Sequence, residues 1–304
     1  MDNFKISGII PPLITPLTGH LSLDQKALER IIDHVIQGGV DGIFLLGSTG
    51  EGPSLTHEVK KHVIESGVKW VSDRVPVFIN ITSTSHTDSI RLAEFSSLPG
   101  ADYAVLAPPY YFDMSQGELL RYCTAVADQS PIPILLYNIP LYAKTKFEPG
   151  TVWQLAAHEN IVGIKDSSGS INYIHQLLKE RKSEHFSILV GPELLLGESL
   201  LLGCDGGVCG GANLYPGLFS KFYAAAVKKK QERISMYQKL LEQLNTRVYQ
   251  AADSPMSISI GLKYILAQKG ICSAQMALPV YDALSVNQKH LLDELDREFS
   301  NLGY

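Results

Sequence analysis

Eight short apolar runs, separated by polar segments with helical periodicity, constrain the fold of this chain more than any other feature. The runs begin at Gly8, Val40, Val75, Ala101, Pro131, Ile161, Phe186 and Gly206. Most of these starts are about 25–35 residues apart, which is the length of one strand–helix unit. Because the runs are apolar almost throughout, we expect strands of a parallel sheet that is covered on both faces.

The segments between the runs carry helical patterns with recognisable ends. Apolar residues recur at helical spacing over residues 27–36. Ser22 and Gln25 have the spacing of a capping box before this helix. Gly38 and Gly39 are expected to end the helix, because glycine readily adopts the left-handed conformation of a helix C-terminus. Thr56 and Ser115 are predicted to cap two later helices.

Eight strand–helix repeats predict an α/β fold, a (β/α)8 TIM barrel. An open doubly wound sheet is the alternative, but no GxGxxG follows the first run. After the last run only helical segments are expected, at 231–250, 257–268 and 286–299. No linker rich in Pro, Gly or Ser separates them, so we expect a barrel over 1–225 and a C-terminal helical region over 226–304 packed on it.

Composition argues against several classes of function. The formal net charge is −5, which gives no basic surface for nucleic acid or for an anionic membrane. The lysine run 228–230 is interpreted as a solvated helix face. No apolar run approaches the ~18–20 residues of a membrane-spanning helix, and the N-terminus lacks the layout of a signal peptide. A cytoplasmic protein with neither nucleic-acid nor membrane partners is expected.

The cysteines and histidines do not form a recognisable metal or redox motif. Cys123, Cys204, Cys209 and Cys272 include no CxxC and are predicted to be free buried thiols. The nine histidines are scattered, with no HxH or HExxH. We therefore predict no metal site.

Barrel enzymes bind substrate at the C-terminal ends of their strands, so the residues that end the apolar runs are candidates. These are Ser48, Thr49, Glu51, Tyr110, Tyr111, Tyr137, Asn138, Lys165, Gly191, Glu193, Val208 and Gly210. They include no recognisable Ser-His-Asp arrangement and no facing pair of carboxylates. An apolar barrel disfavours the ammonium form of a lysine, and a neutral amine attacks a ketone to form an imine. A nearby tyrosine can relay protons.

Each candidate also has an ordinary structural interpretation. Lys165 at a strand end is equally able to extend to water, and the tyrosines are compatible with core packing. The segment Gly47–Gly52 fits a tight turn, and the glycines at 206–211 fit a close approach of backbone. The residues alone therefore indicate a barrel enzyme, with imine formation as one option.

Four motifs, in this order along nearly the whole chain, resemble those of one superfamily. They are GSTGE at Gly47–Glu51, PPYY at Pro108–Tyr111, YNIP at Tyr137–Pro140 and GIKDSSG at Gly163–Gly169. The sequence resembles the dihydrodipicolinate synthase and N-acetylneuraminate lyase superfamily of pyruvate-dependent class I aldolases. The resemblance implies a keto-acid substrate, pyruvate with an aldehyde partner, and no cofactor.

The resemblance also assigns expected roles, position by position. Lys165 matches the lysine that forms a Schiff base with the keto carbon, and Tyr137 the tyrosine that moves protons. Thr49 matches the residue that holds the pyruvate carboxylate, and Ser48 a member of the hydroxyl relay to Tyr137. Tyr111 matches a tyrosine that completes the relay in a neighbouring subunit, which implies a homotetramer built from two dimers.

The substrate-facing positions depart from both named branches. Gly191 and Val208 match residues that line the pyruvate end through main-chain groups. Tyr142 stands where the synthase branch has an arginine for the aldehyde carboxylate, and an aromatic ring does not replace a guanidinium. Of the acidic pair that holds sugar hydroxyls in the lyase branch, only Glu193 is present. Ser167, just beyond the lysine, offers a hydroxyl to such a substrate.

These departures favour reversible aldol cleavage of a 2-keto-3-deoxy sugar acid, or a similar 2-keto acid, to pyruvate and an aldehyde. The alternatives are dihydrodipicolinate synthase, N-acetylneuraminate lyase and a keto-sugar-acid dehydratase that expels a hydroxyl from the same imine. Two further classes stay open. One is a barrel that binds phosphate at the turns after the seventh and eighth strands. The other is a keto-acid sensor without turnover.

Overall fold

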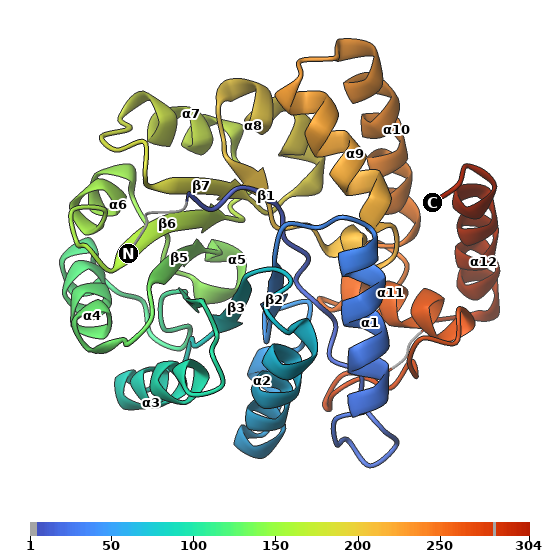
Figure 1. Ribbon diagram of the computed structural model, residues 1–304, viewed down its shortest axis with the longest axis horizontal. Coiled ribbons are helices and arrows are strands. Elements are labelled where there is room, and N and C mark those ends of the chain that lie inside the picture. Colours follow the sequence, from blue (N-terminus) through green and yellow to red (C-terminus); the bar gives the residue numbers. More distant parts are fainter. Residues whose placement is uncertain (1–4, 282–283) are drawn as a thin grey trace.

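The computed structural model describes residues 5–281 and 284–304. Eight strands form one parallel sheet in the order β1-β8-β7-β6-β5-β4-β3-β2, and the sheet curls with helices outside it (Figure 1). The strands are β1 Gly8–Ile9, β2 Ile43–Leu45, β3 Val77–Asn80, β4 Tyr103–Leu106, β5 Ile134–Asn138, β6 Ile161–Asp166, β7 Ser187–Val190 and β8 Gly206–Gly207. Each strand lies within one of the eight apolar runs, which confirms the predicted parallel strands.

The two edges of the curled sheet meet beside β1. The segment after β1 forms a parallel bridge with β2, between Pro12 and Phe44. The backbone N–H of Leu13 donates to the carbonyl of Phe44 at 2.9 Å, and the N–H of Phe44 donates to the carbonyl of Pro11 at 3.0 Å. These hydrogen bonds satisfy backbone groups that an open sheet edge would leave unpaired.

Helices connect the strands and cover the outer face of the sheet (Figure 1). They are α1 Gln25–Gln37, α2 His57–Val71, α3 His86–Ser97, α4 Gln116–Gln129, α5 Pro140–Ala143, α6 Pro149–Leu155, α7 Ile171–Lys179, α8 Leu196–Leu202 and α9 Pro216–Val227. Short 3₁₀ turns η1 Gly52–Ser54, η2 Glu193–Leu195 and η3 Gly210–Asn213 follow β2, β7 and β8. The strand–helix repeat is therefore as the sequence indicates.

The caps of α2 and α4 are confirmed, and the predicted cap of α1 is wrong. The hydroxyl of Thr56 accepts from the N–H of Val59, and Ser115 forms a capping box with Glu118. At α1 the cap is Asp24, whose carboxylate accepts from the N–H of Ala27 at 3.0 Å. Ser22 lies too early, and its hydroxyl is instead 2.8 Å from that of Thr18. Asp is as good an N-cap as Ser, so the residue adjacent to the helix takes the role.

Two apolar clusters lie on the two sides of the sheet. The larger one fills the space between the strands and the helices. The smaller one fills the interior of the curled sheet and includes Phe44, Phe78, Val105, Leu135, Tyr137, Leu189 and Val208. This inner cluster is the surface on which the candidate site rests.

The chain ends in three helices, α10 Gln231–Arg247, α11 Ser257–Gln268 and α12 Val286–Asn301. In Figure 1, α10 lies beside α9, and α12 lies on the far side of α10 and α11. The hydroxyl of Tyr215 donates to the carboxylate of Asp296 at 2.8 Å, which links α12 to the segment before α9. All four cysteines are buried and free. Among the described residues, no helix is both long and apolar enough to span a bilayer.

Candidate active site

Lys165 lies near the C-terminal end of β6 and faces the inside of the sheet. It pairs in register with Tyr137 of β5, so the two side chains stand next to each other. Its Nζ lies 4.0 Å from the centroid of the Tyr137 ring and 5.1 Å from that of Phe44. The residue is only 5% exposed, and within the described part of the chain it forms no ion pair. A buried primary amine therefore faces two aromatic rings.

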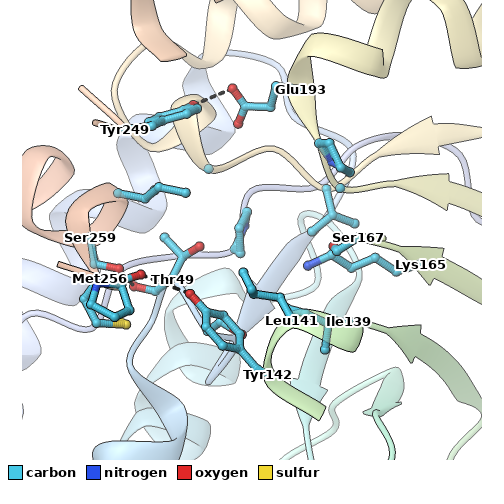
Figure 2. A pocket seen from close by; sticks show the side chains of 18 of the residues that line it. Thr49, Ile139, Leu141, Tyr142, Lys165, Ser167, Glu193, Tyr249, Met256 and Ser259 are labelled. Carbon is cyan, nitrogen blue, oxygen red and sulfur yellow. Dashed lines mark hydrogen bonds between the residues drawn. The ribbon is translucent and has the colours of Figure 1, made fainter. Parts of the chain in front are cut away.

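A cavity of about 340 Å³ opens above this lysine (Figure 2). Its wall includes Lys165 together with Ser48, Thr49, Tyr137, Tyr142, Ser167, Gly191, Glu193 and Val208. They include every residue with an expected role in the reaction or in substrate binding except Tyr111. Of the other strand-end candidates, Gly210 also lines the cavity, whereas Glu51, Tyr110 and Asn138 do not. Loops from five strand ends therefore bring the predicted residues to one place.

The loop between β2 and α2 presents backbone N–H groups at this cavity. Two of its carbonyls accept from the loop itself: that of Gly47 from the N–H of Gly52, and that of Ser48 from the N–H of Glu51. Two others accept from side chains outside the loop: that of Thr49 from the Ser259 hydroxyl, and that of Gly50 from the Thr15 hydroxyl. The N–H groups of Ser48 and Thr49 have no partner among the described residues. Consecutive unpaired N–H groups form a concave site for an anion such as a carboxylate.

Gly191 is required by the packing behind the cavity wall. A Cβ at this position would lie 2.2 Å from the hydroxyl oxygen of Ser167. The N–H of Gly191 donates to the carbonyl of Asp166 at 2.7 Å, which joins the end of β7 to the end of β6. The absent side chain leaves room for the Ser167 hydroxyl beside the cavity.

Asp166 and Asn138 fix the ends of the two neighbouring strands. The Asn138 side-chain amide donates to Asp166 at 2.7 Å, and the hydroxyl of Ser168 donates to the same carboxylate at 2.9 Å. Burial raises the pKa of Asp166, while these hydrogen bonds act in the opposite direction. Ser168 is therefore engaged, and Ser167 is the serine that lines the cavity.

Glu193 lines the cavity, but both of its carboxylate oxygens already have partners. The hydroxyl of Tyr249 donates to Oε2, as Figure 2 shows, and the N–H of Gly211 donates to Oε1 at 2.9 Å. Burial raises the pKa of Glu193 to about 7, against the lowering effect of these hydrogen bonds. The residue is 7% exposed.

A second cavity of about 230 Å³ adjoins the first. Both are lined by Ser48, Tyr137 and Tyr142, and the second one reaches Tyr110 and the polar pair Asn80 and Thr82 on the β3 side. Sequence reasoning named Tyr110 but not the pair, because Asn80 and Thr82 belong to no recognised motif.

Tyr111 lies apart from both cavities of its own chain. It is 68% exposed, and its ring packs edge to face on Phe112 at 4.8 Å between centroids. The side chain of Lys144 donates to the Tyr111 carbonyl at 3.2 Å. Phe112 and Leu141 are also strongly exposed, at 75% and 79%.

Sequence reasoning missed the contribution of the C-terminal helices to the cavity wall. Asn245, Tyr249, Pro255, Met256, Ile258 and Ser259 all line it. The hydroxyl of Tyr142 donates to the carbonyl of Pro255 at 3.0 Å, which ties the β5 side of the cavity to the segment before α11 (Figure 2). Helical periodicity shows which residues are buried, but not which loop they face.

Comparisons with known proteins agree with the fold and the motifs. The model of the dihydrodipicolinate synthetase family matches residues 5–297. A 4-hydroxy-tetrahydrodipicolinate synthase of Methanoculleus marisnigri is 37% identical over 220 residues, which are 72% of this chain and 75% of the relative. The relative YagE of Escherichia coli, named a putative 2-dehydro-3-deoxy-D-gluconate aldolase, is 37% identical over 69% of this chain and 70% of its own.

Solved structures give the same result over almost the full length. The dihydrodipicolinate synthase of Bacteroides thetaiotaomicron superposes with a TM-score of 0.92 at 37% identity, covering 96% of this chain and 98% of that one. YagE in complex with pyruvate superposes with a TM-score of 0.91 at 31% identity, covering 97% and 99%. With a family model that spans nearly every described residue, the chain belongs to the dihydrodipicolinate synthetase family.

Proposed function

We propose that the protein is a class I lyase that cleaves a 2-keto-3-deoxy sugar acid to pyruvate and an aldehyde through a Schiff base on Lys165. The observation that carries the proposal is the position of Lys165 Nζ, which is buried, has no ion pair with any described residue and lies 4.0 Å from the centroid of the Tyr137 ring. Membership of the family and the named aldolase relative support it. The proposal takes the curled sheet as a complete (β/α)8 barrel, which is supported by the hydrogen bonds that join its edges.

The first step is imine formation. The neutral amine of Lys165 adds to the C2 carbonyl of the keto acid, loss of water gives an imine, and uptake of one proton, which the final hydrolysis releases again, gives the protonated imine. The inner apolar cluster under the lysine keeps its side chain extended toward the cavity. The unpaired N–H groups of Ser48 and Thr49 receive the C1 carboxylate and so orient C2 toward the amine.

The second step breaks the C3–C4 bond. Tyr137 accepts the proton of the C4 hydroxyl, C4 becomes the carbonyl carbon of the leaving aldehyde, and the bonding electrons pass to the imine as an enamine. The enamine then takes a proton at C3, and water hydrolyses the resulting imine to pyruvate and the free amine. A tyrosine hydroxyl is a weak base at neutral pH, so Ser48 and Tyr111 of a second copy of the chain act as its proton relay.

The cavity supports an uncharged aldehyde half. Lys165 is its only cationic lining residue among those described, so a second carboxylate would enter without a guanidinium or ammonium of its own. The hydroxyls of Tyr142, Tyr249 and Ser259 already donate to protein acceptors. The side chains of Ser167 and Asn245 have no hydrogen-bond partner among the described residues and can bind substrate hydroxyls, which suits a short hydroxylated aldehyde.

Exposure of Tyr111 supports an assembly in which it completes the site of a second copy. Tyr111 and Phe112, whose rings pack edge to face, are strongly exposed, as is Leu141, and exposed apolar side chains of this kind mark interaction surfaces. We expect the protein to be a homotetramer. Analytical ultracentrifugation of the wild type and Y111A, combined with activity, tests this: mixing Y111A with K165A should restore activity only if tyrosine and lysine act across copies.

Borohydride trapping tests the central proposal. The protein is incubated with pyruvate and sodium borohydride, digested, and the site of the added mass is located by mass spectrometry. The adduct is expected on Lys165 and absent from K165R, which keeps the charge but not the nucleophile. No adduct, or an adduct on another lysine, would contradict the proposed mechanism.

A substrate panel then separates the possible reactions. Sugar-derived 2-keto-3-deoxy acids of increasing length are incubated with the protein, and pyruvate release is followed by a coupled dehydrogenase. Release of pyruvate with an aldehyde supports the lyase. A dehydrated keto acid without pyruvate would identify a dehydratase, and condensation of pyruvate with aspartate semialdehyde would identify a synthase.

A further inference from the structure

Lys263 of α11 is fully buried and joined to the loop that carries Ser48 and Thr49. Its Nζ lies 2.5 Å from Oε1 of Glu51, the last residue of the GSTGE segment, and donates to the carbonyl of Gln275 at 2.6 Å. The other Glu51 oxygen accepts from the N–H of Ala277 at 2.6 Å. Lys263 is 0% exposed and Glu51 1%. One ion pair therefore connects the β2 loop to two segments of the C-terminal region.

A second contact comes from the same helix, one turn earlier. The hydroxyl of Ser259 donates to the carbonyl of Thr49 at 2.9 Å. Residues four apart lie on the same face of a helix, so Ser259 and Lys263 both face the loop. They hold it at two points, the carbonyl of Thr49 and the carboxylate of Glu51.

The loop needs such support because of its backbone conformation. Leu46 has a φ of 60° and Glu51 a φ of 58°, and both are non-glycine residues in the left-handed region. Such conformations persist only where surrounding contacts enforce them. The carbonyl of Thr49 is engaged by Ser259, while the N–H groups of Ser48 and Thr49, two residues that line the cavity, have no partner among the described residues.

We propose that Lys263 and Ser259 are positioning residues, which set the affinity of the site for the carboxylate of its keto-acid substrate by holding the Gly47–Glu51 loop. The identity of the ligand rests on the proposed function; the support of the loop does not. Neither residue needs to touch the substrate through its charge or hydroxyl, because both are already engaged with the loop.

The ionic character of the contact fits a positioning role. Burial lowers the pKa of Lys263, and Glu51 opposes that effect. Removing one partner of a buried ion pair is costly, because the remaining charge is left buried and uncompensated. The pair therefore fixes where Glu51, and with it the neighbouring N–H groups, can lie.

The test compares K263M with K269M, a matched control on the same helix. Lys269 at the end of α11 forms an ion pair with Asp296 of α12 at 2.9 Å, away from the loop. KM and kcat for the keto acid, the pyruvate concentration for half-maximal borohydride trapping, and hydrogen exchange of residues 46–52 are measured well below each melting temperature. S259A is included because it removes one neutral hydrogen bond and is expected to fold normally.

K263M is expected to raise KM and the half-maximal pyruvate concentration about tenfold or more, which corresponds to one charge-assisted contact, and to speed hydrogen exchange in 46–52. S259A should raise KM and the half-maximal pyruvate concentration a few-fold and should also speed the hydrogen exchange of this loop. K269M should leave KM and the exchange of this loop unchanged. Unaltered KM and loop exchange in S259A and in folded K263M would overturn the proposal, as would equal effects in K269M. If the wild type traps no pyruvate, the proposed function fails, and hydrogen exchange alone still tests the support of the loop.

Discussion

Two buried lysines, Lys165 on β6 and Lys263 on α11, have contrasting surroundings. Lys165, inside the curled sheet, faces the rings of Tyr137 and Phe44 and forms no ion pair among the described residues. Lys263, on α11, has the carboxylate of Glu51 at 2.5 Å and the carbonyl of Gln275 at 2.6 Å. Both are at least 95% buried.

The difference shows that partners, rather than burial, separate a structural lysine from a candidate nucleophile. The nitrogen of Lys263 already has a carboxylate and a carbonyl at hydrogen-bond distance, so it is occupied by protein partners and is not presented to a substrate. The amine of Lys165 faces two aromatic rings and the cavity and has no carboxylate partner among the described residues, so it can meet a ketone that enters the cavity. The two sites should therefore respond to the same substitution in opposite ways.

The largest expected effect is the loss of activity in K165M. Without the amine no imine forms, so pyruvate release should fall by about 10⁴-fold or more. The melting temperature should stay the same or rise, because methionine fills the apolar site without an ionisable group. Coupled pyruvate detection and thermal unfolding, measured on the same preparation, check both parts; a marked fall in melting temperature would assign Lys165 a structural role as well.

K263M should show the opposite result to K165M, with a large loss of stability. Removing one member of a buried ion pair leaves Glu51 uncompensated, which costs about 3–5 kcal/mol of the free energy of unfolding. The double variant E51Q/K263M should recover most of this loss, since it buries no unpaired charge. Denaturant unfolding at one fixed protein concentration measures the difference, and equal stability of the single and double variants would contradict the assignment.

The sequence predicts the parts of the site that lie at strand ends. Lys165, Tyr137 and the Ser48–Thr49 pair end apolar runs, and parallel strands place their C-terminal ends on one face. Their convergence follows from the strand–helix repeat alone. Motif resemblance then supplied roles that periodicity does not contain.

The contributions of Lys263, Ser259 and Tyr249 were not predicted, for a physical reason. They lie on or beside helices whose pattern specifies a buried face but no partner, and the partners are about 50 to 210 residues away in the chain. Lys263 in an apolar helix face was the only available signal, because a fully buried lysine requires an acceptor. The error at Ser22 has a local cause, since Asp24 competes for the same cap.

Glu193 extends the comparison to a buried carboxyl group whose nearest partner is a neutral hydroxyl. Its pKa is about 7 in the folded protein, against an ordinary value of 4.5. At a pH between these two pKa values, the folded state binds more protons than the unfolded state. The stability that Glu193 contributes is therefore present at low pH and is lost as the pH rises through about 7. The difference between the two pKa values corresponds to at most about 3 kcal/mol of the free energy of unfolding.

The prediction is that the difference in unfolding free energy between wild type and E193Q decreases as the pH rises from 5 to 8. Denaturant unfolding at several pH values measures it. Y249F sharpens the test: the Tyr249 hydroxyl lowers the pKa of Glu193, so its removal should move the transition to higher pH. A difference that is constant with pH, or that grows, would show that Glu193 is ionised throughout.

The smallest expected effect concerns Tyr142, which joins the same two regions by a neutral hydrogen bond to the carbonyl of Pro255. The side chain is 40% exposed, so water replaces much of the lost bond in Y142F, and the cost in stability should be about 0.5–1 kcal/mol. Y281F, at a tyrosine that is 70% exposed, serves as the matched control and should change nothing measurable. The KM for pyruvate in the reverse reaction should be unaffected, because the loop at Ser48 and Thr49 is held by other residues. A loss in Y142F as large as that in K263M would mean that the link between the two regions depends on this bond rather than on the buried ion pair.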